Sequence, residues 1–476
     1  MIGPMVKVAP PKSGPPGPKG APLLGSLPDF RRDIRLALLD GWHEYGDIVE
    51  FNVAGPSYLV VHPDYIQQIL RGNESNFPHA PHLRSRWAKI VGGGLVTSRG
   101  TFWERQRRLA NPAFDHDRVV DFGQIMTDTT NEMLEEWQKA ADSGAAIEVR
   151  DEMMRLTITI LSKAMFSADI WSKTDQIGRD VGVLLTHASN RLFSPVDPPE
   201  WIPIPAHRRF LNAQRSFDRL IYEIIAERRR EPRNDLLSMF LQARDEESGE
   251  AMDDMQVRDE VRTMFIAGHE TTATSLGWTW YLLSAYPEVA AKVRTELAAV
   301  LGGRTPTAED LPNLPYLWRV IQESLRLYPP IWMYLRTALT EDEFDGYWMQ
   351  AGRNIFVSPY ITHRHPDFYE NPEGFDPSRF EPEKTREWHR FQYFPFGGGP
   401  RKCIGNNFAI MEMQLVVATA AQRFELGLVP GHPVDIQAGL SLRPREGLLM
   451  TVKPARPAAA REHGGDVAID RERVGV

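Results

Sequence analysis

Cysteine is almost absent from the sequence, because the 476-residue chain has only one, Cys403. A single thiol cannot form an internal disulfide, and so little cysteine fits a reducing, cytosolic setting. The sequence also lacks a strong excess of either charge. Its net charge is −8 and both signs are mixed along the chain, so we expect no nucleic-acid partner.

Long apolar runs are missing as well. The N-terminal stretch MIGPMVKVAPPKSGPPGPKGAP is rich in proline and glycine, and no run in it is long enough for a signal peptide or a membrane span. Hydrophobic residues still make up 42% of the chain and aromatic residues 10%, which is enough for a large buried core. We therefore expect a globular, cytoplasmic protein that is monomeric and has no membrane span.

Helical periodicity dominates the remaining pattern. It predicts helices at 34–45, 102–111, 120–141, 150–166, 175–191, 208–231, 259–284, 287–301, 317–327 and 403–424. Strand patterns occur at 48–61, where Gly55-Pro56 marks a hairpin, and at 354–358 and 440–452. We expect a mainly α fold with a smaller β part in one domain at 21–457. A Pro/Gly-rich segment at 1–20 precedes this domain, and a polar tail at 458–476 follows it.

The cysteine lies in a distinctive stretch, RFQYFPFGGGPRKCIGNNFAIMEM. Gly397 and the two glycines after it remove side chains, so the backbone can turn tightly and approach a bulky group. Cys403 begins a helical pattern, and a helix N-terminus favours a thiolate. A zinc site is excluded because no histidines cluster with Cys403. A small buried hydrophobe, a nucleophile and an axial ligand to heme iron all remain open.

A second unusual pattern is MFIAGHETTATSLGWTWYLLS at 264–284, where polar residues interrupt an apolar helix. Thr271 follows Ala267 by one helical turn, so its hydroxyl can bond to that carbonyl. A zinc-protease HExxH pattern is excluded, because the position that would carry the second histidine is Ala273. A simple explanation, with back-bonded threonines and an outward-facing Glu270, also remains open.

The cysteine loop FPFGGGPRKCIG resembles the heme-binding loop of the cytochrome P450 superfamily. The pattern Phe-x-x-Gly-x-Arg-x-Cys-x-Gly matches at Phe396, Gly399, Arg401, Cys403 and Gly405. The resemblance implies that Cys403 is the proximal iron ligand, that Phe396 packs beside the sulfur and that Arg401 pairs with a heme propionate. It also implies the P450-type fold, with heme b (iron protoporphyrin IX) held between the distal helix and the helix that starts at the cysteine loop.

Other segments extend the resemblance. AGHETT is similar to the family's oxygen-activation motif, which implies that Glu270 and Thr271 form an acid–alcohol pair that supplies protons. TFWERQRR matches the family's Trp-x-x-x-Arg at Trp103 and Arg107, and Arg336 matches an arginine that often follows the Glu-x-x-Arg helix. The resemblance implies that these last three side chains bind the propionates.

The Glu-x-x-Arg pattern itself occurs in ESLR, at Glu323 and Arg326, and FDPSRF supplies Arg379 as a third member. The resemblance implies a buried network that supports the heme loop without taking part in catalysis. It further implies a monooxygenase that inserts one atom of O2 into a lipophilic substrate of the fatty acid, terpenoid or steroid class. A peroxide-driven heme-thiolate enzyme and a non-catalytic heme or lipid binder are the alternatives, and the Glu270-Thr271 pattern favours the monooxygenase.

The electrons must come from elsewhere, since no P-loop, GxGxxG or CxxxxCxxC pattern occurs in the sequence. A separate donor is implied, either a ferredoxin with its reductase or a flavodoxin-type protein. Arg105, Arg108 and Lys402 suggest a local basic surface for an acidic donor. Apolar residues at 81–96, 191–205, 265–271, 330–334 and 439–442 suggest the walls of a lipophilic pocket.

Overall fold

A computed structural model describes residues 14–53, 55–167, 171–192, 198–199, 201–202 and 204–455. The predicted tail at 458–476 and most of the predicted segment at 1–20 lie outside these residues. The chain forms two compact units. We call them the β-rich unit (Met1–Pro81, Met333–Pro372 and His389–Lys402) and the helical unit (His82–Trp332, Glu373–Trp388 and Cys403–Val476), and each is described by itself.

The β-rich unit is organised by a four-stranded sheet with the order β1-β2-β7-β4. β1 (Ile48–Asn52) and β2 (Pro56–Val60) form the antiparallel hairpin that the sequence predicts. β2 then pairs in parallel with β7 (Asn354–Val357), and β7 pairs antiparallel with β4 (Tyr334–Thr337). The sheet thus places Arg336 on β4 opposite Ile355 of β7.

One longer helix and several short elements complete the β-rich unit. They are α1 (Leu27–Tyr45), α2 (Pro63–Gln67), a π-helical turn (Gln68–Gly72), a 3₁₀ turn (Glu74–Asn76), β5 (Asp342–Phe344), β6 (Tyr347–Met349), α14 (Pro359–Thr362) and a 3₁₀ turn (Gly399–Arg401). The stretch His389–Lys402 of this unit is called the heme-loop segment below. The core is an apolar cluster that combines Tyr58 and Val60 of β2, Ile355 and Val357 of β7, and Phe391 of the heme-loop segment. Burial of these side chains fixes the start of that segment against the sheet.

Helices build most of the second unit. Their bounds are α3 (Pro81–Val91), α4 (Gly100–Ala110), α5 (His116–Val120), α6 (Gly123–Ser143), α7 (Val149–Phe166), α8 (Trp171–Leu192), α9 (Pro205–Arg230), α10 (Leu236–Gln242), α11 (Asp254–Ala285), α12 (Pro287–Leu301), α13 (Pro315–Leu327), α15 (Pro382–Thr385) and α16 (Asn406–Arg423), with 3₁₀ turns at Asn111–Phe114, Ala308–Asn313 and Pro377–Phe380. Each of the ten helices expected from the sequence overlaps an observed one, and the predicted 287–301 coincides with α12. The helix expected from Cys403, however, begins only at Asn406, because Gly405 is its N-cap.

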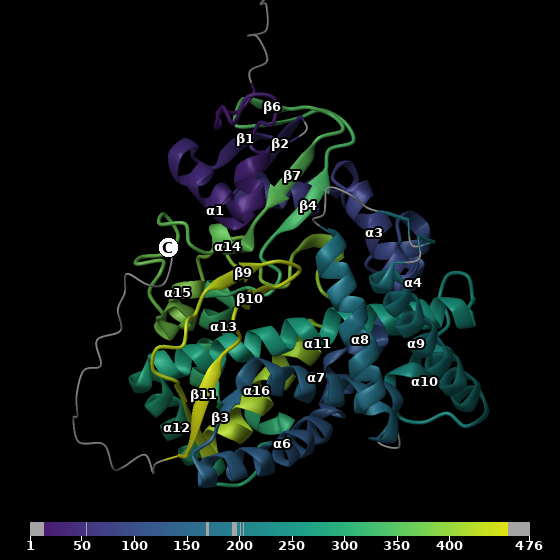
Figure 1. Ribbon diagram of the computed structural model, residues 1–476, viewed down its shortest axis with the longest axis vertical. Helices are drawn as coiled ribbons and strands as arrows, with labels where there is room; N and C mark the ends of the chain where they lie inside the picture. Colours follow the sequence, from purple (N-terminus) through teal and green to yellow (C-terminus); the bar gives the residue numbers. More distant parts are fainter. Residues whose placement is uncertain are drawn as a thin grey trace, which may run out of the picture. The chain divides into compact units, whose positions relative to one another are not determined.

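The longest helix, α11, spans 32 residues and runs through the helical unit beside α7 and α16 (Figure 1). Its start is a capping box, in which the Asp253 side chain accepts from the backbone N–H of Gln256 while the Gln256 side chain accepts in return. Its middle is buried on nearly every face, as expected of a helix surrounded by other elements. α11 therefore provides a rigid axis for this unit.

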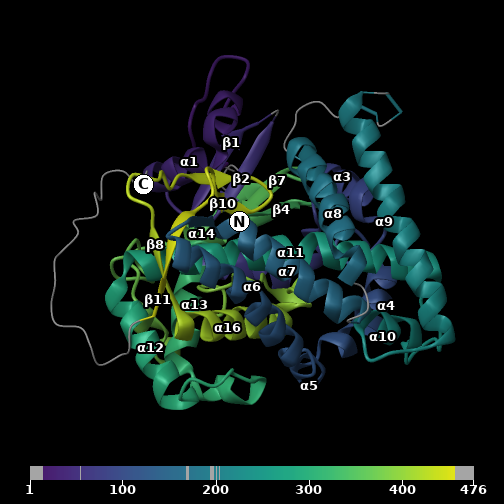
Figure 2. The same ribbon diagram turned by 60° about the horizontal axis from the view of Figure 1, so that its bottom comes forward.

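Two small sheets belong to the helical unit. β11 (Leu449–Pro454) pairs antiparallel with β8 (Phe424–Leu428) and with β3 (Ala146–Glu148), and the yellow strands β8 and β11 lie side by side in Figure 2. β9 (Ile436–Ala438) and β10 (Leu442–Pro444) form a second antiparallel pair. The strand signal predicted at 440–452 thus corresponds to two strands, β10 and β11.

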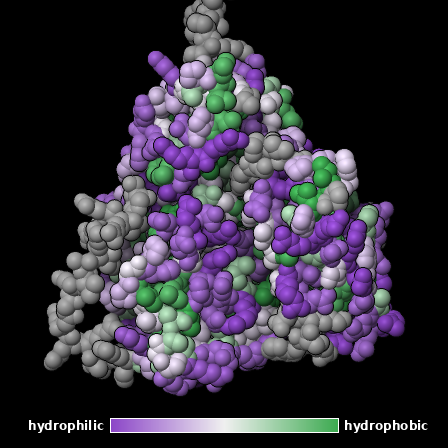
Figure 3. All heavy atoms as spheres, in the orientation of Figure 1, coloured by the Kyte–Doolittle hydropathy of each residue, from purple (hydrophilic) through white to green (hydrophobic). Residues whose placement is uncertain are grey.

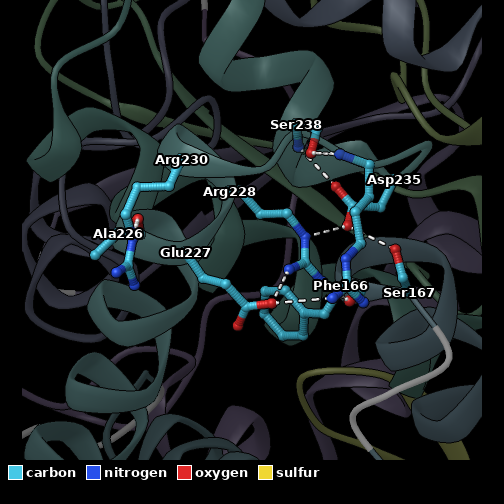
Figure 4. A network of polar contacts seen from close by, with 9 residues as sticks. Phe166, Ser167, Ala226, Glu227, Arg228, Arg230, Asp235 and Ser238 are labelled. Carbon is cyan, nitrogen blue, oxygen red and sulfur yellow. Dashed lines mark hydrogen bonds and ion pairs between the residues drawn. The ribbon is translucent and has the colours of Figure 1, made fainter.

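A buried ion pair joins the end of α9 to the start of α10 (Figure 4). Arg228 Nε donates to Asp235 Oδ2 at 2.7 Å, and both side chains are almost completely buried. Asp235 also accepts from the Ser238 backbone N–H at 2.8 Å, so it serves as the N-cap of α10 as well. The same guanidinium donates to the carbonyl of Phe166 at the end of α7.

The face shown in Figure 3 is mainly hydrophilic, and its hydrophobic residues form small separate patches. In the described part of the chain, no helix is both long enough and apolar enough to cross a membrane.

Candidate active site

The heme-loop segment of the β-rich unit has a backbone that needs glycine. Gly397 and Gly399 have φ values of +70° and +67°, which residues with a Cβ rarely adopt. A Cβ on Gly399 would lie 1.8 Å from the carbonyl oxygen of Leu70, and a Cβ on Gly398 would lie 2.2 Å from the Phe391 ring. The loop can therefore keep this close packing only without side chains at these positions.

Two arginines of the β-rich unit are candidates for binding an anion. Arg336 is 6% exposed, and burial lowers its pKa to about 10. No carboxylate of the described residues pairs with it, and its guanidinium makes a long 3.5 Å hydrogen bond to the carbonyl of Leu335. Arg401 lies 3.8 Å from Glu74. A buried cation with no carboxylate partner within the protein suits an anionic ligand.

In the helical unit, Cys403 precedes α16 and its side chain is exposed. This placement excludes the small buried hydrophobe that remained open from the sequence. Trp103 is buried on α4, and Arg107 lies one helical turn further along. Burial lowers the pKa of Arg107, while the negative charge of Cys403 raises it, so the two side chains interact electrostatically. In the part of the chain described here, Arg107 has no carboxylate partner.

The middle of α11 has one accessible face. Between Asp259 and Leu283 every residue is buried except Ala267 and Gly268, which are exposed, and Thr271, which is half-buried. These three residues follow one another at i, i+1 and i+4, so they share one side of the helix. The Thr271 hydroxyl donates to the Ala267 carbonyl at 2.7 Å, as the sequence predicts. A flat, largely apolar group could therefore lie against this face.

Glu270 is oriented differently from Thr271. It is buried and accepts a hydrogen bond from Ser441 Oγ at 2.8 Å, while Arg443 lies 3.8 Å from the same carboxylate oxygen. Within the described residues, no hydrogen bond joins Glu270 to Thr271. The outward-facing Glu270 of the simple explanation is therefore wrong. Sequence reasoning also missed Ser441 and Arg443, for which no local signal exists.

The predicted structural network is confirmed. Arg326 Nε and Nη2 donate to the two oxygens of Glu323 at 2.6 and 2.8 Å, and neither side chain is exposed. Arg379 Nε donates to Glu323 at 3.3 Å. The network fixes the segment that follows residue 373 against α13.

The predicted basic surface is not supported for its two α4 members. Arg108 forms a bidentate pair with Asp245 and Arg105 pairs with Glu250, so their charges are balanced within the protein. Asp245 has its pKa lowered to about 2, chiefly by the hydrogen bond from Arg108. This pairing reduces what either arginine can offer an acidic partner.

These residues fit an iron porphyrin that carries carboxylates. The helical unit has an accessible thiol at Cys403 and an accessible face of α11. Each unit, taken by itself, has an arginine, Arg107 or Arg336, for which the described residues provide no carboxylate partner. Cysteine thiolates can bind heme iron and arginines suit carboxylates, so the chemistry of these side chains is compatible with a heme-thiolate protein.

Comparison with known proteins gives the family. Residues 15–453 match the family described as Cytochrome P450. The chain belongs to this family and is a heme-iron monooxygenase, which inserts one oxygen atom of O2 into a lipophilic substrate with electrons from a redox partner. The predictions of a mainly α P450-type fold and of this reaction class are confirmed.

Several relatives are similar over most of their length. Cyclooctatin synthase of Streptomyces melanosporofaciens is 34% identical over 92% of this chain and 94% of its own. Cyclooctat-9-en-7-ol 5-monooxygenase of the same organism is 36% identical over 87% of this chain and 90% of its own. Pentalenene oxygenase of Streptomyces avermitilis is 30% identical, with coverages of 88% and 92%. The crystal structure of the cytochrome P450DA heme domain superposes with a TM-score of 0.85 at 28% identity, covering 94% of this chain and 98% of its own.

Proposed function

We propose that the protein is a heme b monooxygenase that oxidises a polycyclic terpenoid, with Cys403 as the axial ligand. The observation that carries the cofactor assignment is the exposed Cys403 thiol, which interacts electrostatically with Arg107, in a unit whose α11 exposes Ala267 and Gly268. Trp103, Arg107, Arg336 and Arg401 would bind the propionates, since guanidinium and indole N–H groups donate to carboxylates and the described residues provide no carboxylate partner for Arg107 or Arg336. Phe396 and Gly397 would line the sulfur side.

When bound, the heme supplies the redox chemistry that activates O2. The chain must then deliver protons and exclude bulk water. Glu270 is the buried acid suited to relaying protons, and Thr271 presents a hydroxyl on the exposed face of α11. Because these two side chains are not hydrogen-bonded to each other, a proton passing from one to the other needs an intervening donor. A water molecule would meet that need.

The terpenoid assignment is supported by the relatives. Two of them are named for oxidising cyclooctat-9-en-7-ol and pentalenene, which are terpenoid-type molecules. Small residues at Ala267 and Gly268 leave room for a rigid, bulky skeleton beside the helix. The predicted pocket segment at 191–205 lies partly outside the described residues. In the segment at 330–334, Trp332 is fully engaged in packing, with its Nε1 donating to the carbonyl of Gly439 at 3.0 Å.

Electron supply and setting complete the proposal. A ferredoxin with its reductase, or a flavodoxin-type protein, would reduce the enzyme, since monooxygenases of this family draw electrons from a redox partner. The single cysteine supports a cytoplasmic setting. We also propose that the catalytic domain extends over 21–457 and acts as a monomer.

The test is a titration of the purified ferric holoenzyme with polycyclic terpenes, fatty acids and steroids, following the Soret band. We expect a low- to high-spin shift with terpenes at the lowest concentrations. A shift with fatty acids or steroids alone would refute the terpenoid class while leaving the cofactor assignment intact. Cys403→Ser should abolish the thiolate-type spectrum, and its persistence in this variant would refute the axial role. Turnover with hydrogen peroxide alone would mark the peroxide-driven alternative.

A further inference from the structure

The carboxylate of Glu270 is held by residues from a distant part of the chain. Ser441 Oγ donates to Glu270 Oε1 at 2.8 Å across 171 residues of sequence, and both side chains are buried. A hydrogen bond to a charged acceptor in a buried setting is about twice as strong as a neutral one. It also allows few orientations of the carboxyl group, so Ser441 limits where Glu270 can point.

The turn that carries Ser441 is itself fixed. We call residues 439–442 the acid-holding turn. Trp278, two helical turns after Glu270 on α11, donates through Nε1 to the carbonyl of Leu442 at 2.7 Å. The Leu442 N–H donates to Pro330 at 3.0 Å, and Trp332 Nε1 donates to the carbonyl of the first residue of the turn at 3.0 Å. Because α11 carries both Glu270 and Trp278, the hydrogen bond from Trp278 to the turn keeps Ser441 in a fixed position relative to Glu270.

Charge acts in the same direction as the hydrogen bond. Arg443, two residues beyond Ser441 on β10, lies 3.8 Å from Glu270 Oε1. Its Nε donates to Gln437 Oε1 at 3.1 Å, and this neutral partner leaves the guanidinium charge available to Glu270. The Arg443 side chain is 27% exposed whereas that of Glu270 is 5% exposed, so Arg443 links the buried acid to solvent.

We propose that Ser441 is the positioning residue for Glu270 in proton delivery and that Arg443 supplies a positive charge beside the same carboxylate. Ser441 and Arg443 reach no reacting atom in this scheme and act only through Glu270. This inference rests on the proposed role of Glu270 and adds to it the two groups on which that role depends.

The first test is a double-mutant cycle on the folded holoenzyme, with urea unfolding as the readout. The variants are Ser441→Ala, Glu270→Leu and their combination, because leucine cannot accept the hydrogen bond from Ser441. Ser441→Ala should lower the folded-to-unfolded ratio of the wild-type protein. We expect the factor by which it lowers this ratio to be smaller by about tenfold or more once Glu270 is replaced. Additive effects would overturn the contact. Ser162→Ala is the matched control, because Ser162 is a buried serine whose hydroxyl, within the described residues, donates to the Ile158 carbonyl of its own helix at 2.7 Å.

The second test measures proton delivery, as product formed and hydrogen peroxide released per electron consumed, across a pH series. We expect Ser441→Ala to divert several-fold more electrons to peroxide and to alter the pH profile, and Ser441→Thr to restore both. Two groups near Glu270 should influence this profile, Arg443 and the preceding residue His269. Arg150 acts indirectly, because its charge interacts with that of Arg443. Arg443→Gln should alter the profile in the same direction.

The outcomes separate the two claims. If Glu270→Gln leaves the partition between product and peroxide unchanged, the proposed role of Glu270 fails. If Glu270→Gln changes it while Ser441→Ala behaves like Ser162→Ala, only the positioning role of Ser441 is overturned. An unchanged thiolate-type spectrum and substrate titration in each variant would show that the heme and its pocket are intact.

Discussion

Removal of Arg228 should destabilise the protein far more than removal of its neighbour Arg229. Arg228 Nε donates to Asp235 at 2.7 Å, Nη1 donates to Glu227 at 2.6 Å and Nη2 donates to Phe166 at 2.5 Å. Arg228→Ala leaves the fully buried Asp235 carboxylate without its cation, and breaking a buried pair in this way costs about 3–5 kcal/mol. This loss corresponds to a folded-to-unfolded ratio that is lower by roughly 150-fold to several thousandfold.

Arg229 provides the matched control, because it pairs with Asp254 at the surface and the two side chains are 44% and 50% exposed. Arg229→Ala should cost less than about 1 kcal/mol. The assay is urea unfolding of the holoenzymes followed by tryptophan fluorescence, with Arg228→Lys expected to lie between Arg228→Ala and the wild-type protein. Equal midpoints for Arg228→Ala and Arg229→Ala would refute the reasoning that burial decides the strength of these pairs.

Three further perturbations test the described packing and electrostatics. Burial raises the pKa of Glu260 from 4.5 to about 8, so the folded protein binds a proton that the unfolded chain releases, and stability falls as pH rises between these values. Glu260→Gln should flatten this dependence and gain a few kcal/mol over the wild-type protein at about pH 9, and an unchanged slope of urea midpoint against pH would contradict the shift. Gly399→Ala should lower heme content and stability, whereas Gly302→Ala, at φ +60° with nothing within 4 Å, should cost about 1 kcal/mol of backbone strain; equal losses would rule out the clash. Glu323→Ala should lower the free energy of unfolding by about 3–5 kcal/mol in urea, because it leaves a buried charge uncompensated. The double variant Glu323→Leu/Arg326→Met, which replaces the pair by apolar side chains, should lower it by less. The reverse order would argue against an uncompensated buried charge.

Long amphipathic helices could be predicted from the sequence because their periodicity repeats over many turns. Elements whose partners lie far along the chain could not. β4 has four residues, and it is a strand because β7 pairs with it. α3 was missed because Ile90 and Val91 are its buried residues, which gives too short an apolar stripe for a helical pattern. The start of α16 was placed too early because the apolar Ile404 continues the pattern across the Gly405 cap.

The site shows the same division. Cys403 and the Glu270-Thr271 pair stand out as local motifs, and the family match supports the chemistry they imply. The partners of Glu270 could not be found locally, since Ser441 lies 171 residues away and serine is common in turns. The proposed basic surface is not supported at Arg105 and Arg108 for a similar reason. The carboxylate that neutralises Arg108 lies 137 residues further along the chain, so the sequence shows the cation without its partner.

The neighbouring positions of Glu270 and Thr271 give one helical turn two separate tasks. Successive residues of an α-helix point about 100° apart, so an acid directed toward β10 leaves the next side chain directed toward the accessible face. The Thr271 hydroxyl has one hydrogen, and it donates that hydrogen to the Ala267 carbonyl at 2.7 Å. Toward a group on the accessible face, Thr271 therefore offers acceptor lone pairs until that bond is released. In the proposed mechanism, the two adjacent residues thus have separate roles, Glu270 as the proton source and Thr271 as the hydroxyl on the accessible face, and a proton passing between them would need an intervening donor.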